Sequence, residues 1–519
     1  MAFPIVLTAD RTLMSRYDVL MDGMMAASQT TSMPAPVIKT VLLPRSAHPR
    51  GRALVAPLGL RRIEAALAQA GLADQLVVVD DVHLDQAIGP ETKIIAISSG
   101  EPAGLGMSSS TMTGVVGGSI YPHAMFTKLL DKVQRLRQQR CPNAKIILGG
   151  PGAWQLAMSS SERDTLRVGR TSKFAGPADG ELGSSPHAEV DHVICGYAEG
   201  NAAAIFQDLL AGRELPYLIE GQPVPADQIP PIVHPSTMAV VEISRGCGLG
   251  CAFCTIGQTA MQHLPPETIL ADIRTNLTAG FTSAAILSED LFRYGAQGTR
   301  CDPEALLSLL SRIRSMPGLR IIQPDHVNVA SVAQYNDSQL REVHRLLSGG
   351  FQDHPWVNLG IETPSGALLQ ANGGRPKMGG VAPEQWGTFC AQQLRRLVAA
   401  GFIPMASLVI GLPGETPAEI EQTRQWVRGL QGQAVTIFPV LYAPIGGESP
   451  PDPSHLTRAH WQLMRDCYEF NFRWVPRIYW DSQRGAGVGL PRRLVIQALG
   501  QGNVVLWRSM LAHKARQAK

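Results

Sequence analysis

Short apolar runs alternate with segments of helical periodicity through most of the chain. Between residues 37 and 215 the runs predict strands, and the segments between them, such as 58–70 and 123–136, repeat apolar residues every three or four positions. Strands that are apolar throughout are typical of a parallel sheet with helices on both faces. The sequence therefore predicts a doubly wound α/β domain with strands at Val37–Leu43, Leu76–Val79, Ile94–Ile97, Lys145–Leu148 and His192–Ile194.

The same alternation returns after a proline-rich stretch. Residues 216–235 contain six prolines and are predicted to be a linker. Residues 236–445 form a second α/β unit, and residues 446–519 a mostly helical C-terminal extension. The predicted strands of the second unit are Met238–Ile243, Ala284–Leu287, Leu319–Ile322, Val357–Ile361, Pro404–Ile410 and Val435–Leu441.

Two segments stand apart from this alternation. Residues 1–36 are predicted to be an N-terminal extension that opens with a strand at Ile5–Ala9. The polar, glycine-rich segment 159–189 is predicted to be a loop.

Composition and charge narrow the functional classes. The 519 residues suffice for about three domains, and a hydrophobic content of 45% supports a large core. A net charge of +3 without a long basic run argues against nucleic acid as a partner. The chain shows no signal peptide and no run of ~18 apolar residues that would span a bilayer. We therefore expect a cytoplasmic protein whose thiols stay reduced.

Three cysteines in one short loop carry the chemistry. Cys247, Cys251 and Cys254 have the spacing C-x3-C-x2-C, and Gly246, Gly248 and Gly250 between them favour a tight turn. Three thiolates can hold three irons of a cubane cluster and leave the fourth iron open to a substrate. A structural zinc site would need a second pair of ligands, and the next cysteine is Cys301. A disulfide would leave one of the three thiols unpaired.

A strand followed by C-x3-C-x-Phe-Cys resembles the radical S-adenosylmethionine superfamily. The resemblance implies a partial (β/α)6 barrel and a 4Fe–4S cluster on these cysteines. It also implies S-adenosylmethionine, bound near Phe253 and chelated by the open iron through its amino and carboxylate groups. An electron from a donor such as flavodoxin or ferredoxin then yields a 5′-deoxyadenosyl radical.

Further positions match the barrel strands of that superfamily. Ser288, Glu289 and Asp290 follow the second strand, where the family binds the amino group of S-adenosylmethionine, but the paired glycines of the family motif are missing and either acid can fill that role. His326 and Asn328 follow the third strand, and Glu362 ends the fourth. Gly411 and Leu412, in a strand–turn–helix segment, resemble the fifth-strand element that meets the adenine.

The first sheet resembles a cobalamin-binding domain, through local signals at its predicted strand ends. Ser98 and Ser99 begin a loop of small residues, Gly149 and Gly150 end a strand in glycines, and Gly196 and Glu199 match the Gly-x-x-Glu element of the last strand. The cobalt-ligand motif Asp-x-His-x-x-Gly is incomplete, because Ser46 replaces the aspartate, so His48 is a weak candidate for the lower axial ligand.

The leading hypothesis is a cobalamin-dependent radical enzyme that methylates an unactivated carbon of a small molecule or peptide. The alternatives are a ring-forming or oxidative enzyme of the tetrapyrrole-cyclase type, a radical S-adenosylmethionine enzyme without cobalamin, and a non-catalytic electron carrier. The elements around Ser288 and Gly411 speak against the carrier, because a carrier needs no substrate shelf. The sequence does not identify the substrate.

Overall fold

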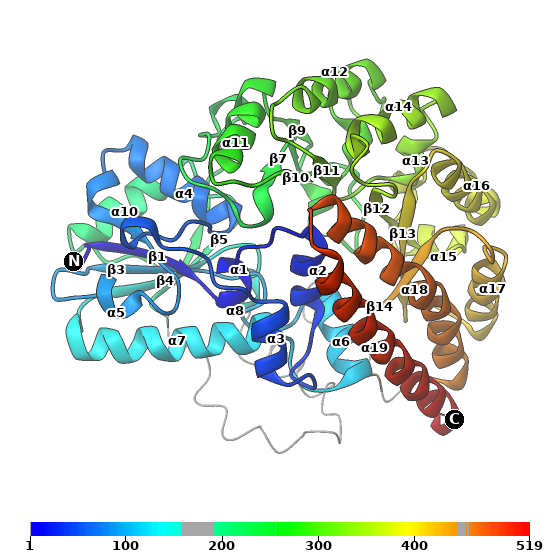
Figure 1. Cartoon of the computed structure of the whole chain (residues 1–519), viewed down its shortest axis with the longest axis horizontal. Coiled ribbons are helices and arrows are strands. Elements are labelled where there is room, and N and C mark those ends of the chain that lie inside the picture. The colour runs from blue at the N-terminus through cyan, green and yellow to red at the C-terminus, as the bar shows by residue number, and fades with distance from the viewer. Residues whose placement is uncertain (1, 158–189, 255, 444–452, 454–455, 519) are drawn as a thin grey trace.

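The computed structural model describes residues 2–157, 190–254, 256–443, 453 and 456–518. An N-terminal α/β half lies beside a barrel-like half, and two long C-terminal helices cross the lower right of the view (Figure 1). This arrangement confirms the predicted α/β fold class with a helical C-terminal segment. The predicted loop 159–189 lies outside the described residues.

The N-terminal half is a parallel sheet with helices on both faces. Within the described residues its strand order is β2-β1-β3-β4-β5-β6, and separate apolar clusters fill the two faces. Its strands are β1 (Ile5–Ala9), β2 (Leu76–Val78), β3 (Ile94–Ser98), β4 (Lys145–Gly149), β5 (His192–Cys195) and β6 (Leu218–Glu220). Its helices are α1 (Arg11–Met14), α2 (Leu20–Ser28), α3 (Ala35–Val41), α4 (Leu58–Gln69), α5 (Leu84–Ala87), α6 (Met107–Val116), α7 (Tyr121–Arg140), α8 (Trp154–Ala157) and α10 (Ala202–Leu210).

The strand prediction at Val37–Leu43 is wrong, because most of that segment is helix α3. Pro34 and Pro36 suit the start of a helix. In a strand covered on both faces the side chains of Lys39 and Thr40 would be buried, and burial of such polar groups without partners costs free energy. The strand at Ile5–Ala9 is instead an inner strand of the sheet, and all five of its residues are buried.

The predicted linker contains a strand. Within 216–235, β6 (Leu218–Glu220) pairs in parallel with β5 at the edge of the N-terminal sheet. The remaining proline-rich residues lead into the first barrel strand. The domain boundaries as a whole stay predictions.

Six strands of the second half follow one another as predicted, with shifts of a few residues at their ends. In the described part of the chain they form two parallel sheets, β11-β10-β7 and β12-β13-β14, joined by a bridge between His326 and Asn358. The strands are β7 (Val240–Glu242), β10 (Ser283–Leu287), β11 (Ile321–Pro324), β12 (Trp356–Glu362), β13 (Ile403–Ile410) and β14 (Thr436–Leu441), with β8 (Ser244–Arg245) and β9 (Gln262–His263) as a small antiparallel pair. The helices are α11 (Pro266–Thr278), α12 (Pro303–Arg314), α13 (Val329–Val332), α14 (Asp337–Ser348), α15 (Gly366–Ala371), α16 (Trp386–Ala399) and α17 (Pro417–Arg428).

The C-terminal extension covers the open edge of this partial barrel. It consists of α18 (Arg458–Gly485) and α19 (Leu490–Gln517). The buried Asn471 amide accepts the N–H of Ile437 and donates to its carbonyl, both at 2.8 Å, so it takes the place of a neighbouring strand beside β14. No helix among the described residues is long and apolar enough to cross a bilayer.

Candidate active site

The carboxyl ends of the strands in the N-terminal sheet face the carboxyl ends of the barrel strands. Arg245, which follows β7, donates to Glu199 beyond the end of β5 at 2.9 Å and to Glu242 at 2.8 Å. All three side chains are 4–6% exposed, and the guanidinium stacks on the Tyr197 ring at 3.6 Å. Burial lowers the pKa of Arg245, but the two glutamates more than offset it and raise it overall. This ion pair therefore joins the N-terminal sheet to the residue that precedes the cysteine loop.

A second contact joins the two halves at β14, the last strand of the barrel. The Thr111 hydroxyl on α6 accepts the N–H of Leu441 at the end of β14, at 2.7 Å. Met107, at the start of α6, packs on the apolar cluster of Leu368, Val409 and Leu412 near the end of β13. Ligands of parallel α/β sheets bind at the carboxyl ends of the strands. The space between the two edges is therefore the candidate site.

The cysteine loop turns as its glycines predict. Gly246, Gly248 and Gly250 all have positive φ, between 69° and 78°. A Cβ on Gly246 would lie 2.5 Å from the Ala260 carbonyl oxygen, so the loop needs glycine there. Burial raises the pKa of the Cys247 and Cys251 thiols, and neighbouring cations oppose this rise. The structure thus places all three cysteines on one tight turn, while their role as cluster ligands stays a prediction.

Arg293 supplies one of these cations. It is 4% exposed and donates to the Cys247 carbonyl at 2.8 Å and to the Gly298 carbonyl at 2.7 Å, with Cys247 Sγ 4.0 Å away. Lys377 supplies the other cation, paired with the Glu362 carboxylate. Burial lowers the pKa of Lys377, but Glu362 more than offsets it, and the net pKa is raised. Both cations fit a cluster whose three thiolates give it net negative charge.

The two acids after β10 have different environments. The Asp290 carboxylate is fully buried and accepts hydrogen bonds from the Ser331 hydroxyl at 2.6 Å and the Asn328 N–H at 3.2 Å. Burial raises the pKa of Asp290 to about 6. Glu289 is half-buried and makes no hydrogen bond within the described part of the chain. Glu289, rather than Asp290, is therefore the acid available to a bound ligand.

The other predicted barrel positions lie around the same mouth. Ser288 shares a hydrogen bond with Ser244, which joins the ends of the first two barrel strands. Gly411 donates its N–H to the Glu415 carboxylate at 2.9 Å, and Leu412 is 3% exposed, so its side chain belongs to the core. Glu362 has a positive φ of 64° at a register shift in β12. Their contacts with S-adenosylmethionine stay predictions, as does that of Phe253.

His326 extends the set of charged groups at the mouth. Its Nδ1 lies 3.0 Å from Asp325 Oδ1, which also accepts from the Asn358 amide at 3.0 Å. Burial lowers the pKa of His326, but the Asp325 carboxylate more than offsets it and raises the pKa. Burial raises the pKa of Glu289, and the positive charge of His326 partly opposes that rise, so the two groups are electrostatically coupled.

The predicted cobalamin positions lie at the edge of the N-terminal sheet. Ser98 and Gly149 are paired across β3 and β4, and a Cβ on Gly149 would meet nothing within 4 Å. A Cβ on Gly150 would lie 2.7 Å from the Ser98 hydroxyl and 2.8 Å from the Ser99 backbone, so Gly150 is required by packing. Gly196 has a positive φ of 90°.

Two buried polar atoms beside this edge have no partner among the described residues. They are Thr8 Oγ1 and Asp10 Oδ2, at the end of β1, whose Ala9 is paired with Ser98. Open space above Gly149 and unpartnered polar atoms fit a large ligand with polar groups, such as a corrinoid. Glu199 is occupied by Arg245, and its contact with a corrinoid stays a prediction.

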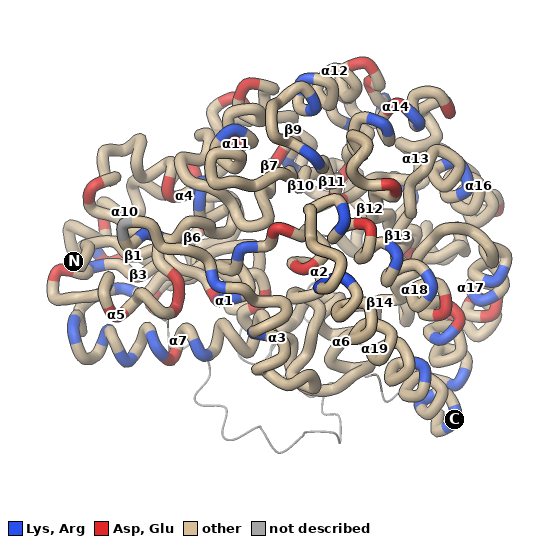
Figure 2. Tube along the Cα trace, in the orientation of Figure 1, with Lys and Arg blue, Asp and Glu red and all other residues tan. Residues whose placement is uncertain are grey.

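Sequence reasoning missed Arg245, Arg293 and Lys377. Arg245 adjoins the cysteine motif, and this adjacency is the one signal that pointed to it. Arg293 and Lys377 lie 46 positions after Cys247 and 15 after Glu362, and no local pattern marks them. Figure 2 shows basic and acidic positions scattered over both halves, so charge alone did not distinguish them.

Comparisons with known proteins bear on this site. No family model matches the chain. The chain is 25% identical over 269 residues to the ribosomal protein uS12 methylthiotransferase RimO of Sorangium cellulosum, which covers 50% of this chain and 48% of that protein. It is 26% identical over 233 residues to the tRNA-2-methylthio-N(6)-dimethylallyladenosine synthase of Halorhodospira halophila, covering 43% of this chain and 44% of that protein. The chain therefore spans about half the length of the curated relatives it matches.

Solved structures match over more of the chain. The radical S-adenosylmethionine methyltransferase TsrM from Kitasatospora setae, with cobalamin and a 4Fe–4S cluster bound, superposes with a TM-score of 0.51 at 12% identity, over 86% of this chain and 77% of that one. The same enzyme with tryptophan and a S-adenosylmethionine analogue gives 0.50, over 85% and 75%, at 12% identity. Motif and relatives agree with the resemblance to the radical S-adenosylmethionine superfamily, and the fold of the chain resembles that of a radical S-adenosylmethionine methyltransferase solved with cobalamin bound.

Proposed function

We propose that this protein is a cobalamin-dependent radical S-adenosylmethionine enzyme that transfers a methyl group to an unactivated carbon of a small molecule or peptide. The observation that carries the proposal is the Arg245 ion pair with Glu199 and Glu242. It holds the cobalamin-type edge of the N-terminal sheet directly against the cysteine loop. In this proposal a methyl donor on one edge would face a radical generator on the other.

The residues of the chain have defined tasks in this proposal. Cys247, Cys251 and Cys254 hold the cluster, and Arg293 and Lys377 balance its negative charge. The Glu289 carboxylate accepts hydrogen bonds from the amino group of S-adenosylmethionine. When bound, the cluster and S-adenosylmethionine supply a 5′-deoxyadenosyl radical, and the corrinoid supplies the methyl group.

The contacts between the halves support a site with little water. Met107 packs on the apolar cluster that contains Leu412, and Arg245 is buried at the contact with Glu199. Protection from water matters because it prevents side reactions of reactive intermediates. An electron donor such as flavodoxin or ferredoxin, and a cytoplasmic location, complete the proposal.

Methylthio transfer is the second candidate, because the matched relatives carry that name. An additional iron–sulfur cluster as sulfur source would need three or four more thiolates. Five cysteines lie outside the loop, and three of them, Cys141, Cys390 and Cys467, are at most 4% exposed, which leaves Cys195 and Cys301. This cysteine inventory favours methyl over methylthio transfer.

The test uses anaerobic protein reconstituted with iron, sulfide and hydroxocobalamin, then given reductant and S-adenosylmethionine labelled with deuterium in its methyl group. We expect 5′-deoxyadenosine, S-adenosylhomocysteine and labelled methylcobalamin in the wild type. The Cys247→Ala/Cys251→Ala/Cys254→Ala variant should lose 5′-deoxyadenosine. A protein that forms 5′-deoxyadenosine but no labelled methylcobalamin would contradict methyl transfer and favour ring formation or oxidation.

A further inference from the structure

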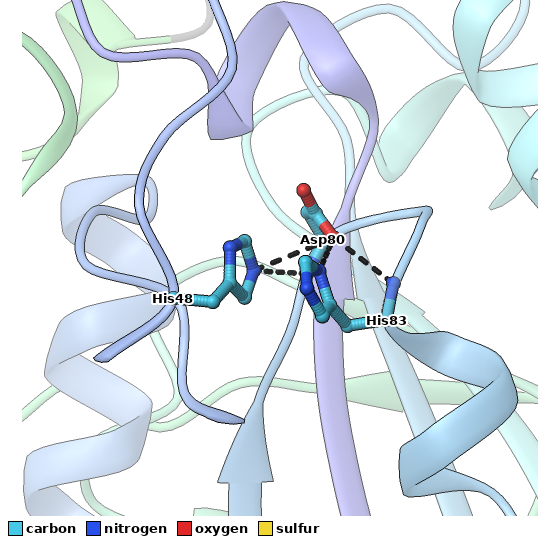
Figure 3. A group of neighbouring side chains, drawn as sticks. All are labelled: His48, Asp80 and His83. Atoms are coloured by element: carbon cyan, nitrogen blue, oxygen red, sulfur yellow. Dashed lines mark hydrogen bonds and ion pairs between the residues drawn. The ribbon is translucent and has the colours of Figure 1, made fainter. Parts of the chain in front are cut away.

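A second cluster of potential ligand side chains, His48, Asp80 and His83, lies beyond the end of β2 in the N-terminal half (Figure 3). His48 lies in the connection between α3 and α4, and Asp80 and His83 lie between β2 and α5. The side chains are 6%, 7% and 28% exposed, respectively. Their ligand atoms all lie within 4.8 Å of one another. The proposed methyl-transfer function uses none of the three residues.

The hydrogen bonds define the protonation of this cluster. His48 Nδ1 donates to the Ser46 carbonyl at 3.3 Å, and its Nε2 accepts the N–H of Asp80 at 3.4 Å. The Nε2 lone pair therefore points toward Asp80. His83 Nδ1 donates to Asp80 Oδ1 at 2.7 Å.

The potential ligand atoms of this cluster already lie close together. His48 Nε2 is 3.4 Å from Asp80 Oδ1, and His83 Nδ1 is 2.7 Å from the same oxygen. His48 Nε2 accepts a long hydrogen bond from the Asp80 N–H, at 3.4 Å, which a bound cation would replace. A cation between the three ligand atoms would thus take the place of these contacts.

We propose that His48, Asp80 and His83 bind a divalent transition-metal ion of the zinc type. Two imidazole nitrogens and one carboxylate form a donor set that zinc accepts, whereas calcium and magnesium prefer oxygen ligands alone. Three protein ligands leave the fourth position to water. The bond from His48 Nδ1 to the Ser46 carbonyl is the usual orienting contact of a metal-bound histidine.

The geometry requires only local adjustment. Zinc ligands at about 2.0–2.2 Å in a tetrahedron lie roughly 3.3 Å from one another. The separations to Asp80 Oδ1 are 2.7 Å from His83 and 3.4 Å from His48. The two rings are stacked at 3.7 Å and must tilt apart, and the partly exposed His83 has room to do so. For Nδ1 of His83 to bind the ion, its proton moves to Nε2, and the ring binds as a neutral imidazole.

This site competes with the weak prediction that His48 ligates cobalt. Both roles need the same Nε2 atom, since Nδ1 is held by Ser46. Zinc on His48 therefore removes His48 as a ligand of a bound corrinoid.

The experiment uses the full chain with its cluster already loaded, so that the three cysteines are not free to bind zinc. The protein is equilibrated with micromolar zinc chloride, passed through a desalting column and assayed for zinc and iron by mass spectrometry. We expect about one zinc per chain in the wild type and at least a tenfold loss in His48→Gln and in Asp80→Asn, with iron unchanged. His513→Gln, on the exposed face of α19, is the control and should retain its zinc.

Cobalt(II) provides a second measurement that does not depend on a variant's folding. Cobalt bound by nitrogen and oxygen gives weak visible bands and no thiolate-to-cobalt charge-transfer band. The proposal is overturned if the wild type retains no zinc, if both variants retain as much as the control, or if the cobalt spectrum shows thiolate ligation. Nitrogen splitting in the paramagnetic resonance spectrum of bound cob(II)alamin, lost in His48→Gln, would also overturn it.

Discussion

At the scale of single residues, burial distinguishes Asp290, which has a structural role, from Glu289, which is free to contact a ligand. Asp290 sits between β10 and β11, and its two hydrogen-bond donors belong to the next connection along the barrel. It therefore fixes the turn from which Arg293 reaches the cysteine loop. Glu289, one position earlier, keeps its carboxylate at the mouth.

Asp290 makes a specific prediction for pH dependence. Its pKa is about 6 in the folded protein, above the value near 3.9 of an unfolded chain. The folded state thus binds the proton more tightly, so this group lowers the free energy of unfolding by about 3 kcal/mol as pH rises from about 4 to about 6. Asp290→Asn should remove that slope and be at least as stable at pH 7. Urea titrations at pH 4.5 and 7 measure how the free energy of unfolding of each protein changes with pH. The same change in the wild type and in Asp290→Asn would contradict the raised pKa of Asp290.

Arg293 makes a prediction for the cluster. Arg293→Met leaves the Cys247 and Gly298 carbonyls without their charged donor and should cost about 2–4 kcal/mol of unfolding free energy. It also removes a positive charge beside Cys247, which should lower the reduction potential of the cluster. Iron content and a potentiometric titration measure both effects. Arg300→Met, exposed nearby in the chain, is the control, and a variant indistinguishable from it would refute the role of Arg293.

At the scale of elements, burial on two faces decides which apolar segment becomes a strand. Ile5–Ala9 has no charged residue and can be covered on both sides, whereas 37–43 includes Lys39 and becomes α3. Both segments are rich in β-branched residues, so propensity alone favoured each of them. Sequence order could not reveal which one the other strands enclose, because that is a property of the assembled sheet.

The two glycines at the end of β4, Gly149 and Gly150, have different roles: Gly150 is required for packing, and Gly149 is predicted to contact the ligand. Gly150 has a φ of 94° and close neighbours, so Gly150→Ala should cost more than about 1 kcal/mol. Gly149→Ala places its methyl group in open space and should leave stability unchanged, but it should lower the corrinoid bound per chain. Thermal unfolding and cobalt analysis test the pair. Full corrinoid loading of Gly149→Ala would contradict the predicted position of the ring.

Much of the candidate site followed from local sequence, and the rest did not. The cysteine spacing, the strand-end glycines and the acids after β10 are local patterns, and the structure brings them to the two facing edges. The cations Arg293 and Lys377 come from segments whose approach to the loop depends on barrel closure. The choice between Glu289 and Asp290 depended on which side chain turns inward. Both residues follow the end of β10, where strand alternation no longer predicts the direction of a side chain.

At the scale of the whole molecule, Arg245 couples the two halves. Glu199→Gln and Arg245→Lys each weaken a buried ion pair, and their coupling should be about 1–3 kcal/mol. A double-mutant cycle in urea gives this value, with the exposed Glu220→Gln as the control. In cluster-loaded protein Glu199→Gln should reduce methyl transfer more than 5′-deoxyadenosine formation, because the edges separate. Additive single effects would show that the pair does not join the halves.

The central claim is an iron with an open position held by Cys247, Cys251 and Cys254. It is tested most directly by paramagnetic resonance of the anaerobic, reduced protein before and after addition of S-adenosylmethionine. The account predicts a 4Fe–4S signal that changes when S-adenosylmethionine binds and disappears when all three cysteines are replaced by alanine. A signal that S-adenosylmethionine leaves unchanged, or one that survives the triple replacement, would contradict it.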